Sequence, residues 1–149
     1  MIRIAVQDVP IDLGVEFAGV AASGAGGIAT FTGITRADDG VTSLELEHYP
    51  GATEAALRRL AEEAVARWAI VGVTIVHRVG TMRPGEPVVF VGTAATHRAA
   101  ALDSCAFLID RLKTDAPFWK REIRGDKASW VEARDGDTHA AARWYKSPS

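Results

Sequence analysis

The alternation of hydrophobic and polar residues along the chain predicts several short strands. In residues 42–48, Leu44, Leu46 and His48 fall on one side and two glutamates on the other, as expected for a strand with one solvent-exposed face. Residues 88–94 are nearly all apolar, which favours a buried central strand. The same criteria predict further strands at residues 2–7, 28–32, 72–80 and 129–133.

Apolar residues spaced three and four positions apart predict two main helices. The first covers residues 53–68, where charged residues occupy the opposite face and Thr53 is the candidate N-cap. The second covers residues 97–113, with Thr96 as its candidate cap. Because Pro117 disfavours helical backbone at the residue before it, the second helix is expected to have ended by that point.

The order of these elements predicts an α+β fold. Residues 12–22 fit a short additional helix, and two pairs of neighbouring strands have the spacing of hairpins, so the strands should be mixed and largely antiparallel. We expect a single domain over residues 1–149, because the chain contains no linker, repeat or low-complexity segment. The tail is polar from about Asp135, but Trp144 and Tyr145 predict that it docks on the domain.

The composition is that of an ordinary globular protein. Hydrophobic residues make up 48% of the chain and charged residues 24%, and the formal net charge of -2 argues against a nucleic-acid-binding protein. The single cysteine excludes an intrachain disulfide and fits a reducing, cytoplasmic location. We expect neither a signal peptide nor a membrane-spanning segment, since no apolar stretch is long enough.

Neither metal binding nor cysteine catalysis is indicated. The histidines, His48, His77, His97 and His139, are not paired with one another or with cysteine at ligand spacing, and His48 and His77 fall within strand patterns as half-buried structural residues. Cys105 lies on the apolar stripe of its helix, where cysteines are usually inert.

A glycine-rich segment at residues 23–27 has two interpretations. Phosphate-binding loops rich in glycine are followed by a helix whose N-terminal amides hold the phosphate. Here a strand is predicted instead, at residues 28–32, so a plain loop is favoured.

The segment of residues 113–122 contains two lysines on either side of a proline and two aromatic residues. In one interpretation, Lys113 compensates the helix dipole and Lys120 is simply solvated. In the other, both lysines face one ligand in a cationic pocket, where an ammonium pair is suited to proton transfer. The residues alone leave both possibilities open.

Further basic residues are candidates for anion binding. His97 and Arg98 stand at the start of the second main helix, where free backbone amides attract anions. A surface pair is an equally good interpretation. Arg36 follows the strand predicted at 28–32, and Arg134 follows the one predicted at 129–133.

A series of short motifs extends over most of the chain. They are residues 30–33 (TFTG) with Arg36, 46–51 (LEHYPG), 76–80 (VHRVG), 84–86 (PGE), 96–98 (THR), 112–114 (LKT), 116–122 (APFWKRE) and 130–134 (WVEAR). Each motif is weak alone. In this order and at these spacings, from about residue 27 to residue 144, they resemble the large, catalytic subunit of molybdopterin synthase. The resemblance implies that family's α/β hammerhead-type fold.

The resemblance also implies a reaction and a set of partners. The substrate is cyclic pyranopterin monophosphate, and no cofactor or metal is required. Sulfur arrives as a thiocarboxylate on the C-terminal Gly-Gly of a small ubiquitin-like subunit, whose tail enters a pocket of the large subunit. Two transfers form the dithiolene of molybdopterin, and the cyclic phosphate opens. The resemblance therefore implies that the chain belongs to a sulfurtransferase of molybdenum cofactor biosynthesis.

Functional residues can be assigned only where the motifs match. The resemblance implies that Lys113 and Lys120 are the two catalytic lysines, with Lys120 the better candidate for direct participation. It implies a substrate-binding role for Arg36, His97, Arg98, Arg121, Glu122 and Arg134. One departure is visible at Ile34, where many relatives have lysine.

The predicted helix length adds a quaternary expectation. His97 and Lys113 are 16 residues apart on one helix, which corresponds to about 24 Å at the rise of an α-helix. A small pterin phosphate does not span that distance. We therefore predict a homodimer, and a heterotetramer with the small subunit, whose pocket combines Lys113 and Lys120 of one copy with His97 and Arg98 of the other.

Two alternatives to an enzyme are considered. A paralogue could bind the pterin phosphate or the small subunit without turnover, but the presence of both Lys113 and Lys120 favours catalysis. An interaction protein without a small-molecule site leaves the order and spacing of the basic motifs unexplained.

Overall fold

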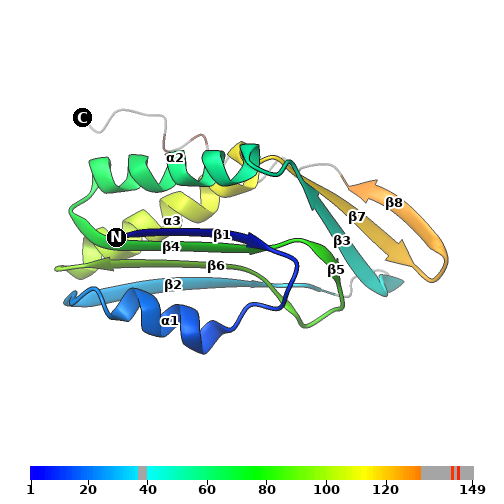
Figure 1. The fold of residues 1–149 in the computed structure, drawn as a ribbon, viewed down its shortest axis with the longest axis horizontal. Helices are drawn as coiled ribbons and strands as arrows, with labels where there is room; N and C mark the ends of the chain where they lie inside the picture. The colour runs from blue at the N-terminus through cyan, green and yellow to red at the C-terminus, as the bar shows by residue number, and fades with distance from the viewer. Residues whose placement is uncertain (37–39, 132–141, 143, 145–149) are drawn as a thin grey trace.

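The computed structural model describes residues 1–36 and 40–131, together with residues 142 and 144. Its strands form two sheets, and the second extends from one end of the first (Figure 1). The first sheet has the order β1-β4-β6-β2, in which β1 and β4 are parallel and the other pairs antiparallel. Its strands are β1 (Ile2–Gln7), β4 (Ile70–Arg78), β6 (Pro87–Ala95) and β2 (Gly27–Ile34).

The second sheet is antiparallel throughout and has the order β5-β3-β7-β8. Its strands are β5 (Gly80–Met82), β3 (Ser43–His48), β7 (Phe118–Arg124) and β8 (Lys127–Val131). The expected α+β class with largely antiparallel strands is therefore confirmed. Strand β7 was not predicted, because its polar and charged residues lack the simple apolar alternation of β3.

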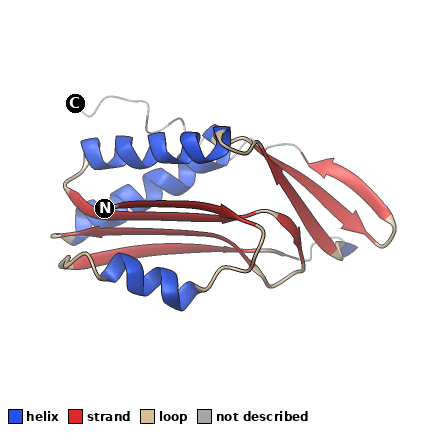
Figure 2. Ribbon diagram, in the orientation of Figure 1, coloured by secondary structure: helices blue, strands red, loops and turns tan. Residues whose placement is uncertain are grey.

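Among the described residues, helices α1, α2 and α3 cover the first sheet (Figure 2). Helices α2 (Ala52–Arg67) and α3 (Arg98–Asp115) pack on one face, and the shorter α1 (Leu13–Ala21) packs on the other. The larger core lies under α2 and α3 and includes Leu57, Phe107 and Leu108, all fully buried. A smaller core on the face of α1 contains Ile11, Val76 and Phe90. Central strand β6 contributes residues to both cores, as its continuous apolar run predicted.

The caps of both main helices differ from the prediction. Gly51 precedes α2 with φ of 86°, and its N–H donates to the Glu54 carboxylate at 3.2 Å. Thr53 instead lies inside the helix and is buried, where its hydroxyl accepts from the Tyr49 N–H and donates to the Pro117 carbonyl. The Thr53 hydroxyl therefore forms hydrogen bonds with residues outside the helix and does not cap the helix N-terminus.

At α3 the N-cap position is occupied by His97, not Thr96, and its side chain makes no capping hydrogen bond. The helix continues to Asp115 and ends at Ala116, whose extended backbone agrees with the constraint from Pro117. The segment at 23–27 leads directly into β2, as predicted for a plain loop. Within the described residues, no helix is both long and apolar enough to cross a membrane.

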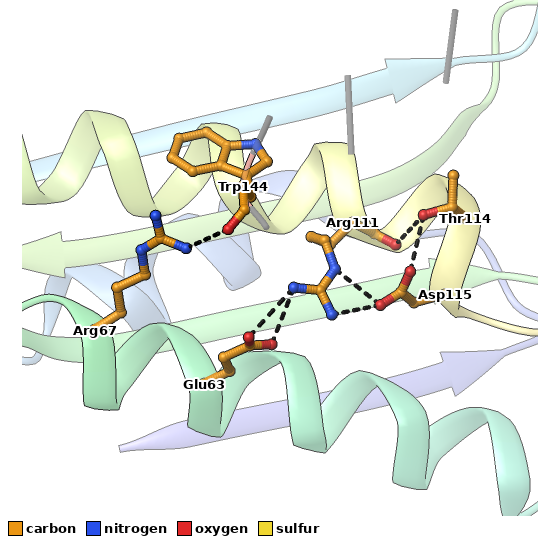
Figure 3. Close-up of polar contacts among 6 residues, drawn as sticks. All are labelled: Glu63, Arg67, Arg111, Thr114, Asp115 and Trp144. Carbon is orange, nitrogen blue, oxygen red and sulfur yellow. Dashed lines mark hydrogen bonds and ion pairs between the residues drawn. The ribbon is translucent and has the colours of Figure 1, made fainter. Parts of the chain in front are cut away.

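Trp144 docks on the helical face, as predicted. Its ring lies edge-on to Trp68 and Phe107 at 5.7 and 5.6 Å, and its indole N–H donates to Asp110 at 2.7 Å. Arg67 donates to its backbone carbonyl at 2.9 Å (Figure 3). Tyr145 and most of the tail lie outside the described residues.

Candidate active site

A pocket of about 690 Å³ lies where the end of the first sheet meets the inner face of the second. Its lining residues come from four secondary-structure elements, which are β2, β3, β7 and the last turn of α3, and from the loop that follows β2. The ends of β4 and β6 complete it. The lining residues are Phe31–Arg36, Val41, Leu44, Leu46, His77, Val88, Lys113, Lys120, Glu122 and Arg124.

Strand β7 decides which basic side chains enter the pocket. Lys120 pairs with Leu46 of β3, and Glu122 pairs with Leu44. Residues directly opposite in an antiparallel pair share a face, so both polar side chains lie on the side of the buried leucines. Pairing of β7 with β3 thus brings Lys120 and Glu122 into the pocket together.

Lys113 reaches the same pocket from a different element. It lies in the last turn of α3, where a cation also compensates the helix dipole. The chain then turns at Pro117 and continues into β7, which contains Lys120. The two lysines of the 113–122 segment therefore face one space, as in the second interpretation of the sequence.

Arg36 lines the pocket at the end of β2. The backbone before it is held by the turn at 83–86, since the Thr35 N–H donates to the Glu86 carbonyl at 2.9 Å and the Gly85 N–H donates to Thr35 at 2.7 Å. Arg78, almost buried, forms an ion pair with the Glu86 carboxylate at 2.7 Å. Ile34, the departure from the family pattern, is 47% exposed and also lines the pocket.

Arg121 lies on the opposite face of β7. Its guanidinium donates to both carboxylate oxygens of Glu45 at 2.8 Å and stacks over the Trp130 ring at 5.3 Å. The hydrogen bond with Glu45 and its charge raise the pKa of Arg121. Within one chain, this side chain does not line the pocket that Lys120 faces, so its substrate-binding role stays a prediction without geometric support.

His97 and Arg98 are also absent from the pocket lining within one chain. They mark the start of α3, 18 residues long, whereas Lys113 lies in its last turn. The separation expected from helix geometry is therefore present. Arg134, the remaining predicted substrate-binding residue, lies outside the described residues.

His77 is a pocket residue that the sequence analysis assigned to structure alone. It is only 4% exposed, stacks on Phe118 at a centroid distance of 3.8 Å, and lines the pocket. Burial, with a smaller effect from the charges of Lys113 and His48, lowers its pKa to about 4, although the hydrogen bond with the Arg78 backbone acts in the opposite direction. The available signal was the position of this histidine near the end of a strand that is mostly apolar before it.

Cys105 is not among the pocket-lining residues and lies in the core beneath α3, as predicted. Burial raises the pKa of its thiol to about 11, so it is protonated at neutral pH. In the described part of the chain, no group of three or more His, Cys, Asp or Glu side chains is arranged to hold a metal ion.

The pocket is electrostatically suited to an anion. Arg36, Lys113, Lys120 and Arg124 contribute positive charge, and Glu122 is the one carboxylate among the described lining residues, paired with Arg124 at 2.7 Å. Lysine and arginine side chains donate hydrogen bonds and accept none. This arrangement can hold a phosphate or carboxylate and supply protons to it.

A family model described as the MoaE protein matches residues 6–115 of the chain. The chain belongs to the MoaE protein family. The molybdopterin synthase catalytic subunit of Mesorhizobium japonicum is 47% identical over 151 residues, covering 98% of this chain and 94% of the relative. That of Salmonella typhimurium is 47% identical over 146 residues, with 95% and 97% covered.

A solved MoaE structure has the same fold. The molybdopterin biosynthesis MoaE protein from Burkholderia ambifaria superposes with a TM-score of 0.85 at 46% identity, and the match covers 99% of this chain and all of that one (100%). The pocket residues of β2, α3 and β7 therefore belong to a chain that matches MoaE proteins over nearly its full length.

Proposed function

We propose that this chain is the catalytic subunit of a molybdopterin synthase. It transfers sulfur from the thiocarboxylated C-terminus of a small ubiquitin-like subunit to cyclic pyranopterin monophosphate, and so forms the dithiolene of molybdopterin. The observation that carries the proposal is the convergence of Lys113 and Lys120 on one cationic pocket in a member of the MoaE family. The printed names of its relatives, which call them catalytic subunits, support it.

The proposed roles follow from the position of each side chain. Lys113 and Lys120 are the catalytic pair, and the family resemblance makes Lys120, which projects from β7 into the pocket, the stronger candidate for acid–base or covalent participation. Arg36 binds the phosphate, and Glu122 orients the neighbouring cations. Cys105 takes no part, so the sulfur comes from the partner subunit.

The small subunit is the proposed partner, and its extended Gly-Gly tail is a suitable occupant of the pocket. A tail without side chains at its end can enter a narrow space, and its thiocarboxylate is an anion that the lysines attract. The word "subunit" in the names of the relatives supports a multi-chain enzyme.

We further propose a homodimer of this chain, and a heterotetramer with two small subunits. The separation of His97 and Arg98 from the lysine pocket within one chain supports a pocket completed by a second copy. Arg134 is assigned to the same composite site on the family resemblance alone. The proposed catalytic domain covers residues 1–149 and works in the cytoplasm without a resident metal or cofactor.

Reconstitution tests the proposal. The purified chain is mixed with the thiocarboxylated small subunit and cyclic pyranopterin monophosphate under anaerobic conditions, and the released pterin is analysed by mass spectrometry. We expect a product with two added sulfurs. A paralogue that only binds the pterin phosphate or the small subunit would form complexes and release no dithiolene, and that result would exclude the enzymatic function.

A further inference from the structure

Two of the sequence motifs contain charged residues to which the proposed function assigns no role, and the fold brings these residues together. The motif at 76–80 includes the end of β4, and the motif at 84–86 directly precedes β6. Arg78 of the first motif is buried and forms an ion pair with Glu86 of the second, with 2.7 Å between Nη1 and Oε1. Because a buried ion pair costs desolvation free energy, stability alone is a weak explanation for its presence.

The Glu86 carboxylate connects Arg78 to the turn at 83–86. Its Oε1 accepts from Arg78, and its Oε2 accepts from the backbone N–H of Arg83 at 2.6 Å. The Glu86 N–H donates to the Arg83 carbonyl at 3.2 Å, which closes a turn with Pro84 and Gly85 at its centre. The φ of Gly85 is 95°, as the third residue of a type II turn requires. The hydrogen bonds from Arg83 and Arg78 lower the pKa of Glu86, so its carboxylate is ionised at neutral pH.

The same turn holds the backbone that leads to Arg36. The Thr35 N–H donates to the Glu86 carbonyl at 2.9 Å, and the Thr35 carbonyl accepts from the Gly85 N–H at 2.7 Å. Thr35 is also buried, with 4% exposure. The next residue, Arg36, lines the pocket. A continuous series of contacts therefore runs from Arg78 through Glu86 and Thr35 to a cation of the pocket.

Glu86 is the main partner of the Arg78 guanidinium. Among the described residues, Nε of Arg78 is buried without a hydrogen-bond partner, and Nη2 makes a long contact of 3.4 Å with the Thr81 carbonyl. Removal of one member of a buried ion pair leaves the charge of the other uncompensated. Loss of the Arg78 charge should therefore disturb the Glu86 carboxylate and the turn that it closes.

We propose that Arg78 is a positioning residue for substrate binding. Through Glu86 it fixes the turn at 83–86, and so holds Arg36 where it meets the phosphate of the bound pterin. This inference rests on the proposed function, which makes Arg36 the phosphate ligand. Arg78 does not line the pocket itself, so its loss should affect substrate affinity more than turnover. A preorganised cation binds better than one that must be ordered on binding.

Arg78→Met tests the proposal, because it removes the charge and keeps a long side chain. We expect the Kd and the KM for cyclic pyranopterin monophosphate to rise about tenfold, as for one weakened hydrogen bond to a charged group, while kcat changes less than about twofold. Arg78→Lys keeps a positive charge without the fork geometry, and should recover part of the affinity. Calorimetric titration with the substrate measures Kd, and the reconstituted reaction gives KM and kcat.

A double-mutant cycle with Arg36 separates positioning from a general loosening of the fold. Arg36→Ala alone should weaken substrate binding by about tenfold or more. Adding Arg78→Met to Arg36→Ala should cause little further loss, because Arg78 acts through Arg36. A full additional loss in the double variant overturns the proposal. So does wild-type affinity in either Arg78→Met or Arg36→Ala.

The matched control is Arg111→Met. The side chains of Arg111 and Arg78 are both 9% exposed and ion-paired, but Arg111 does not line the active-site pocket. This variant should be less stable and still bind the substrate like the wild type. By hydrogen exchange, the Thr35 and Gly85 amides should lose protection in Arg78→Met and keep it in Arg111→Met. Equal losses of affinity in the two variants contradict the positioning role.

A second variant covers the case in which Arg78→Met does not fold. Glu86→Gln removes the charge of the partner and preserves its shape, and it takes the place of Arg78→Met in the same cycle with Arg36. We expect weaker substrate binding in the wild-type background and little further loss in the Arg36→Ala background. Unchanged affinity in Glu86→Gln overturns the proposal.

The two proposals fail in different ways. A wild-type protein that binds the pterin phosphate but releases no dithiolene contradicts the proposed enzymatic function, and the binding cycle still decides the role of Arg78. A wild-type protein that makes dithiolene while Arg78→Met binds the substrate normally contradicts only the role of Arg78. A wild-type protein that does not bind the substrate contradicts both.

Discussion

Lys113 and Lys120 line the same pocket although one ends a helix and the other lies in the middle of a strand. The turn at Pro117 separates these two elements, and the pairing of β7 with β3 determines that Lys120 points toward the helix end. The register of β7 against β3 therefore determines that the two lysines face the same pocket. A shift of β7 by one residue would replace Lys120 with Arg121 at the pocket wall.

Substitution of Lys120 by alanine should reduce dithiolene formation by about 100-fold or more, because a positioned proton donor or acceptor contributes on that scale. The fold and the affinity for the small subunit should change little, since Lys120 is only partly buried. Product formation in the reconstituted reaction measures the effect. Lys127→Ala is the matched control, because Lys127 is an exposed residue of β8 that does not line the pocket. Equal activity of both variants would show that Lys120 is not catalytic.

Mixing two inactive variants should restore activity if the pocket is shared between copies. In a heterodimer of Lys120→Ala with His97→Ala, one pocket carries both defects and the other carries neither. Subunit exchange followed by the product assay should therefore recover a substantial fraction of wild-type activity.

A pocket built from one chain predicts the opposite result, because each copy would then contain one defect. The control is a mixture of Lys120→Ala with Lys113→Ala, two residues that line one pocket within a chain. That mixture should stay inactive. Light scattering of the purified chain gives the oligomeric state independently, and a monomer would contradict the shared pocket.

The buried Arg111 has two acidic partners, Asp115 and Glu63, and we predict that they contribute unequally to the free energy of unfolding (Figure 3). Asp115 accepts from Nε and Nη2 of Arg111 at 2.8 and 2.6 Å and is 26% exposed, whereas Glu63 pairs at 3.1 Å and is 48% exposed. We expect Asp115→Asn to lower the free energy of unfolding by about 1–2 kcal/mol, and Glu63→Gln by less than about 1 kcal/mol. Urea denaturation measures both, and the reverse order would contradict the assignment of the tighter pair.

His77 predicts a loss of stability in mild acid. Its pKa is about 4 in the folded protein against 6.5 for an ordinary histidine, so the unfolded chain binds more protons between these values. The contribution of His77 to the free energy of unfolding is therefore fully present above pH 6.5, decreases as the pH falls toward 4, and levels off below pH 4. The difference between the two pKa values corresponds to about 3 kcal/mol.

Urea midpoints of the wild type and His77→Gln between pH 7 and pH 4.5 measure this contribution, because glutamine does not titrate. The variant should lose less stability over that interval. His48→Gln, which changes a histidine with 21% side-chain exposure, should behave like the wild type. Parallel pH profiles for all three proteins would show that burial of His77 is not the cause.

Local patterns predicted most secondary structure correctly. The alternation around Leu44 and Leu46 reflects one buried face of β3, and the spacing of Leu57, Leu60 and Ala64 reflects the buried stripe of α2. The caps were less predictable. Thr53 is a favourable N-cap by residue type, but it lies inside the helix, and its hydroxyl forms hydrogen bonds with the backbone of Tyr49 and Pro117.

By itself, the sequence determined the fold class, the inert position of Cys105 and, through the order of its motifs, the family. It also indicated Lys113 and Lys120 as candidates for one pocket, since they flank one short turn. Only the tertiary structure decided that Arg121 faces Glu45 and that His77 reaches the pocket. Those outcomes depend on the pairing of strands that are distant in sequence, and no local pattern specifies which neighbour a strand will have.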